Sequence, residues 1–103
     1  MDGVVSDYNF FLEKSHCSRI RRGVIKPGIL TDEQYELLVE LSPVYSIKII
    51  YAMRDYLVAG HPRKTVCERH NVSNGYLSTS LKKLYYTNSV VIRLMQIYKS
   101  NHQ

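Results

Sequence analysis

The stretch from Arg63 to Leu84, RKTVCERHNVSNGYLSTSLKKL, narrows most sharply what this chain of 103 residues can fold into. Its pattern predicts two short helices joined by a tight turn. Asn71 stands where such a turn needs a residue that tolerates a positive φ. Ser73 is placed to accept hydrogen bonds from the free N–H groups that open the second helix. A helical face then repeats at spacings of four and three residues, at Leu77, Leu81 and Leu84.

This layout is typical of the helix-turn-helix units of DNA-binding proteins. Small or apolar residues are expected to hold its two helices together, namely Cys67, Val72, Leu77 and Leu81. Basic residues are expected to bind phosphates, namely Arg63, Lys64, Arg69, Lys82 and Lys83. Four further polar residues are expected to approach base edges or sugars, namely Asn74, Tyr76, Ser78 and Thr79. The same pattern is also compatible with an ordinary helical hairpin whose polar face is only solvated.

The charge distribution agrees with the DNA-binding interpretation. Residues 1–30 carry a net charge of +2, residues 31–60 a net charge of −3, and residues 61–103 a net charge of +6. The positive part of the chain therefore coincides with the helix-turn-helix, as contact with a phosphate backbone requires. A second basic run, Ser18 to Lys26, is compatible with an arm on DNA but fits a solvated linker slightly better.

The sequence contains no pattern that indicates catalysis or a cofactor. It has no Gly-rich phosphate loop, no Gly-x-Ser-x-Gly and no metalloprotease helix. The pair Cys67 and His70 lacks a second ligand pair at the spacing of a structural zinc site, so we expect no metal. No small-molecule ligand is expected either. Two distant cysteines favour reduced thiols in a cytosol, and the absence of a long apolar run predicts neither a membrane span nor a signal peptide.

The rest of the chain predicts further helices. Thr31 and Gln34 have the spacing of a capping box, and Tyr35, Leu37, Leu38 and Leu41 supply the apolar side of the helix that follows. A second helix is expected from about Ser46 to Leu57, with a core-facing stripe at Ile47, Ile50, Tyr51, Met53, Arg54, Leu57 and Val58. Gly60 is placed to end it, and Pro62 suits the start of the next. Residues 1–30 are expected to be partly ordered at most, before a helical domain over residues 31–103.

The C-terminal region leaves two possibilities open. Thr87 or Asn88 is placed to cap a separate final helix, Ser89 to Lys99, but neither Gly nor Pro prevents one continuous helix. Val90, Val91, Leu94 and Tyr98 form an apolar stripe that suits either the core or contact with a second subunit.

A longer block, Ser42 to Leu81, resembles the PapB/FocB family of adhesin biosynthesis transcription regulators. The most specific pieces are AMRDYLVAGH, RKTVCE and NGYLSTSL. The resemblance implies an all-α, multi-helix, oligomeric protein that binds AT-rich repeated sites in double-stranded DNA and regulates a fimbrial operon, with a part in phase variation. It places Arg63 and Cys67 at positions that the family's DNA-binding unit uses. It also implies a bacterial, cytoplasmic, nucleoid-associated protein. The alternative is a helical protein-interaction module whose basic surface is incidental.

Overall fold

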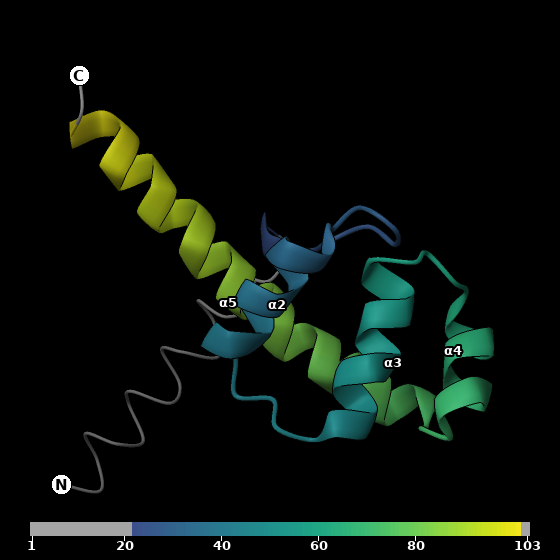
Figure 1. Ribbon diagram of the computed structural model, residues 1–103. Coiled ribbons are helices and arrows are strands. Elements are labelled where there is room, and N and C mark those ends of the chain that lie inside the picture. Colours follow the sequence, from purple (N-terminus) through teal and green to yellow (C-terminus); the bar gives the residue numbers. More distant parts are fainter. Residues whose placement is uncertain (1–21, 102–103) are drawn as a thin grey trace, which may run out of the picture.

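A computed structural model describes residues 22–101, and these contain four helices and no strand. The helices are α2 (Asp32–Leu41), α3 (Ile47–Leu57), α4 (Arg63–His70) and α5 (Asn74–Asn101). The all-α prediction is therefore confirmed. The N-terminal half of α5 packs against α3 and α4, α2 crosses its middle, and its C-terminal end extends beyond the other helices (Figure 1). Within the described part, no helix combines the length and apolar character needed to cross a membrane.

The start of α2 forms as the sequence predicts. The Thr31 side chain accepts a hydrogen bond from the backbone N–H of Gln34, and the Gln34 side chain accepts one from the backbone N–H of Thr31. This reciprocal capping box satisfies two backbone donors that the helix itself leaves free. Tyr35 on the next turn is buried and its hydroxyl donates to the backbone oxygen of Ile50 at 2.5 Å, which ties α2 to α3.

The predicted buried stripe of α3 is confirmed at Met53 and Leu57 but is wrong at three other positions. The helix buries Ile49, Ala52, Met53 and Leu57, whose spacing follows one helical face. Ile47 and Tyr51, which we assigned to the core, are 70% and 58% exposed. Arg54 is also exposed and pairs with Asp32. Apolar side chains surround the first half of this helix, so periodicity alone does not choose between two faces, and packing against α4 and α5 decides.

The final helix is continuous. Residues 74–101 form one helix, so the expectation of a separate helix from Ser89 is wrong and the open alternative is correct. Thr87 donates to the backbone oxygen of Lys83 at 3.2 Å, as a threonine inside a helix does, instead of capping a new one. The Asn88 side chain donates to the backbone oxygen of Gly23 at 3.0 Å. The two supposed caps therefore serve the interior of α5 and its contact with the N-terminal segment.

Residues 22–30 pack against the helices. Gly23 is buried against α5, and Ile25 belongs to the hydrophobic core with 6% of its surface exposed. The backbone N–H groups of Gly28 and Leu30 donate to the backbone oxygens of Tyr56 and Leu57, both at 3.1 Å. The segment therefore bridges the end of α3 and the middle of α5. Most of the basic run Ser18–Lys26 lies outside the described residues, and Arg22 and Lys26 are exposed.

Candidate nucleic-acid interface

The turn between α4 and α5 has the geometry that its sequence predicts. Asn71 adopts φ 52° and ψ 50°, the left-handed conformation in which asparagine is more acceptable than most residues. The backbone N–H of Val72 donates to the oxygen of Cys67 at 3.0 Å, which closes the end of α4. Ser73 then accepts a hydrogen bond from the N–H of Tyr76 at 3.0 Å through its side chain. The turn therefore satisfies backbone groups on both sides and fixes the angle between the helices.

The residues assigned to hold the helix-turn-helix together face the core. Val72, Leu77 and Leu81 are buried, and Cys67 is half-buried against the same core cluster as a free thiol. Val66 of α4 is also fully buried and adds to this contact. The first turns of α5 are thus anchored on one side, which leaves the opposite side to solvent. Among the described residues, no group of three or more His, Cys, Asp or Glu side chains could hold a metal ion.

Arg63 at the start of α4 is held by the first turns of α5. Its Nε donates to Oδ1 of Asn74 at 3.1 Å, and its Nη2 donates to Oγ of Ser78. Its guanidinium also lies 5.7 Å from the centre of the Tyr56 ring, within the range of a cation–π contact. Three residues that we expected to meet DNA separately therefore contact one another. The guanidinium is half-buried, so it braces the two helices in the free protein while keeping part of its charge at the surface.

Asp55 on α3 is the second centre of polar contacts. Its Oδ2 lies 2.5 Å from Nε2 of His70 and 3.2 Å from Nη1 of Arg69. Burial alone would raise the pKa of Asp55, but hydrogen bonds and charge from His70 and Arg69 outweigh it and hold that pKa below its ordinary value. The carboxylate thus ties the C-terminal turn of α4 to α3. Arg69, expected on DNA, is partly engaged by this pair, although its side chain is 48% exposed.

Sequence reasoning missed Asp55 and Tyr56, which support the predicted site from the neighbouring helix. A signal for Asp55 was present, because it is the only acidic residue of α3 and lies between apolar turns. Such a carboxylate requires a cationic partner when it is partly buried. No comparable signal pointed to Tyr56, whose ring meets Arg63 only through the tertiary fold.

The outward side of α4 and α5 remains open. The predicted contact residues that are exposed are Lys64, Arg69, Asn74, Tyr76, Thr79, Lys82 and Lys83. Thr79 already donates to the backbone oxygen of Gly75 at 3.0 Å, which leaves its oxygen available as an acceptor. No acidic residue occurs in α5. The helix therefore presents lysines, hydroxyls and an amide on one exposed surface, the combination that binds phosphates and base edges.

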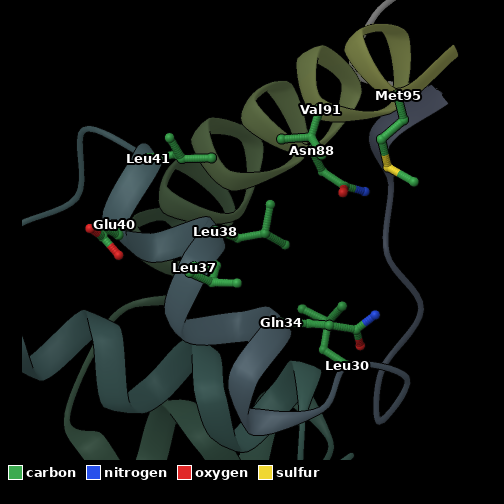
Figure 2. Close-up of a pocket in the computed structure, with 9 residues that line it drawn as sticks. All are labelled: Leu30, Gln34, Leu37, Leu38, Glu40, Leu41, Asn88, Val91 and Met95. Carbon is green, nitrogen blue, oxygen red and sulfur yellow. The ribbon is translucent and has the colours of Figure 1, made fainter. Parts of the chain in front are cut away.

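An apolar groove lies at the other end of the molecule, between α2 and the second half of α5. It has a volume of about 530 Å³. Figure 2 shows Leu38 and Leu41 of α2 and Val91 and Met95 of α5 around this opening. Leu37, which also lines it, is 55% exposed and Leu41 is 64% exposed, so the apolar side predicted for α2 is only partly covered.

Comparison with known proteins identifies the family to which this chain belongs. Residues 6–98 match the family model "Adhesin biosynthesis transcription regulatory protein", PapB. The chain belongs to this family. The PapB major pilus subunit operon regulatory protein of Escherichia coli is 43% identical over 79 residues, which is 77% of this chain and 76% of the relative. The AFA-III adhesin operon regulatory protein of Escherichia coli is 44% identical over 77 residues, which is 75% of this chain and 76% of that relative.

A solved structure supports the same conclusion. The crystal structure of FocB from E. coli matches with a TM-score of 0.76 and 40% sequence identity, over 84% of this chain and 98% of FocB. The resemblance deduced from the sequence is thereby confirmed. Members of the family are transcription regulators of pilus and adhesin operons, not enzymes.

Proposed function

We propose that this chain is a sequence-specific DNA-binding regulator of a fimbrial or adhesin operon. It binds AT-rich repeated sites in double-stranded DNA as an oligomer, on the bacterial nucleoid in the cytoplasm, and takes part in phase variation. The observation that carries the proposal is the exposed surface of α5, the helix that follows the left-handed turn at Asn71. This surface presents Tyr76, Thr79, Lys82 and Lys83. Membership of a family of transcription regulators supports it.

The contacts follow from the positions of the side chains. Lys64, Lys82 and Lys83 are exposed ammonium groups that bind phosphates. Thr79 and Tyr76 are exposed on α5 and approach base edges or sugars. Arg63 supplies a further positive charge and holds Asn74 and Ser78 in place. Cys67 acts through packing, because it sits half-buried one helical turn after Arg63.

Fluorescence anisotropy across a salt series tests the proposal, with one AT-rich duplex of repeated T-tracts and one GC-rich duplex. Four to six phosphates neutralised per subunit give a slope of log K against log salt of about −4 to −5. Tight, cooperative and salt-steep binding to the AT-rich duplex alone is the expected result. Equal, weak binding to both duplexes, with salt-insensitive capture of a protein partner, would favour the interaction module instead.

Self-association is assigned to the exposed apolar side of the second half of α5 and to the groove beside it. Val90, Leu94 and Tyr98 are 38%, 45% and 56% exposed, and Met95, on the wall of the groove, is 60% exposed. Because this apolar surface continues from α5 into the groove against α2, a second copy of the same helix is the occupant that would cover both.

Sedimentation equilibrium of Leu94→Asp tests this assignment. A carboxylate in the apolar contact should shift the protein toward monomer and remove cooperativity on DNA with repeated sites. Tyr51→Asp is the matched control, because it places the same charge on an exposed apolar position of another helix. If both variants associate like the unaltered protein, this surface is not the subunit contact.

A further inference from the structure

A small pocket lies beside α5, on a different flank from the one that Arg63 contacts. Tyr76, Ser80 and Lys83 line it from α5 at spacings of four and three residues, whereas Arg63 meets Asn74 and Ser78. The opposite wall is the loop Pro43–Ser46 together with Ile49 of α3. Its volume is about 230 Å³. This is below the roughly 300–1,000 Å³ of pockets for drug-sized ligands, so the space suits a small group.

The loop wall of this pocket contains the N-terminus of α3, which is uncapped. Ser46 precedes the helix, but its side chain makes no capping hydrogen bond, and the first turn has no acidic residue. This contrasts with α2, where Thr31 and Gln34 form a complete capping box. The first backbone N–H groups of α3 therefore have no partner within the helix, and the helix dipole adds a partial positive charge at the same place.

Ser80 supplies an independent observation from the other wall. It is 97% buried, with only 3% of its surface exposed, and it lines the pocket. Hydroxyls elsewhere in α5 donate back to the preceding turn, as Thr79 does to Gly75 and Thr87 does to Lys83. The Ser80 hydroxyl makes no hydrogen bond to any other residue in the range 22–101. This hydroxyl is therefore available to donate to an acceptor that enters the pocket.

The charges around the pocket select an anion. Lys83 lines it, Lys48 is exposed in the first turn of α3, and no acidic residue lines it. Tyr45, which is 84% exposed, and Tyr76, which is 44% exposed, add phenol groups to the same surface. An acceptor with several oxygens and a single negative charge would satisfy the helix N–H groups, the Ser80 hydroxyl and the Lys83 ammonium together.

We propose that this pocket binds one phosphodiester of the DNA backbone, so that the N-terminus of α3 clamps the strand beside the surface presented by α5. The inference rests on the proposed DNA-binding function and extends the contact from α5 to α3 and the loop that precedes it. It makes Ser46, Ser80 and Tyr45 part of the DNA contact and gives α3 a role in orienting the duplex. Contacts to phosphate fix register, so the clamp would set how α5 lies against the bases.

The test is a pair of N-cap substitutions, Ser46→Asp and Thr31→Asp. Aspartate is a good N-cap, so both variants should fold with unchanged or raised melting temperatures. Both add one negative charge, but only Ser46 borders the pocket. At 0.15 M salt, Ser46→Asp should bind the AT-rich duplex roughly three- to tenfold more weakly than Thr31→Asp, with a salt slope shallower by about 1. Ser80→Ala should weaken binding in the same direction.

Duplexes that carry one uncharged methylphosphonate, moved along the backbone, locate the contact. One position should weaken binding of the unaltered protein and have little effect on Ser46→Asp, which has already lost that contact. Equal affinities and salt slopes for Ser46→Asp and Thr31→Asp would overturn the inference. It would also be overturned if no methylphosphonate position affected the unaltered protein and Ser46→Asp differently. A third contrary result would be that inorganic phosphate shifts the amide NMR signals of residues 47–49 but DNA does not, because the pocket would then bind the free ion and not the duplex. The proposed function fails separately, when the unaltered protein itself shows no salt-steep preference for the AT-rich duplex.

Discussion

The guanidinium of Arg63 donates a hydrogen bond to the hydroxyl of Ser78, and this contact joins the first residue of α4 to the second turn of α5. A second bond, to Asn74, holds the same guanidinium against the first turn. Arg63 therefore has two possible effects on DNA binding that a single substitution mixes. It adds positive charge to the surface, and it keeps two neighbouring polar side chains in fixed positions.

Arg63→Ala and Ser78→Ala separate these effects. If Arg63 contacts a phosphate directly, Arg63→Ala should weaken DNA binding by about 1–3 kcal/mol and make the slope of log K against log salt shallower by about 1. Ser78→Ala, which removes one of the two hydrogen bonds of the brace and keeps the charge, should weaken binding less and leave the slope unchanged. Anisotropy over a salt series measures both, with circular dichroism to verify the helices. If the two variants lose the same affinity at an unchanged slope, Arg63 acts only as a brace.

The carboxylate of Asp55 makes stability depend on pH in a defined direction. Its pKa in the folded protein lies below its ordinary value. The stabilisation is therefore complete above the unfolded pKa of about 4 and is lost as the pH falls through the lower folded value. Asp55→Asn should lower the free energy of unfolding by about 1–3 kcal/mol at pH 7. Urea denaturation should show this difference shrinking below pH 4.

Asp32→Asn is the control for that experiment. Asp32 also pairs with an arginine, Arg54, but its side chain is 57% exposed. Exposed pairs contribute less than about 1 kcal/mol because water screens them. If Asp32→Asn lost as much free energy of unfolding at pH 7 as Asp55→Asn, Asp55 would not be the stabilising centre. The same conclusion would follow if the effect of Asp55→Asn persisted at pH 2.5.

Gly23 and Gly75 predict opposite responses to the same substitution. A Cβ at Gly23 would lie 1.9 Å from the backbone oxygen of Tyr85, so Gly23→Ala must displace the N-terminal segment from α5. We expect a loss of stability on the order of 1–3 kcal/mol. A Cβ at Gly75 meets nothing within 4 Å, and Gly75→Ala should stabilise α5 by about 0.5–1 kcal/mol. Thermal denaturation of both variants measures this. A neutral Gly23→Ala would mean that residues 22–25 do not pack on α5 in solution.

Local chemistry was readable from the sequence wherever a single residue type decides the backbone. Asn71 occupies the left-handed turn, Ser73 accepts at the start of α5, and Thr31 pairs with Gln34, all as the residue types predict. These features depend on contacts within a few residues, so their physical cause lies entirely in the local sequence. The helix-turn-helix and the all-α class follow from the same local rules together with one periodic row of leucines.

Tertiary packing decided what local rules leave open. The first half of α3 is apolar on more than one face, and only its contact with α4 and α5 selects Ile49 over Ile47 for burial. Thr87 and Asn88 had the residue types of helix caps, but Asn88 instead reaches Gly23, distant in sequence. The brace at Arg63 and the pocket at Ser80 likewise join segments that are far apart along the chain. Residue types and spacing set each helix, whereas distant contacts set which side of it is buried and which is left for DNA.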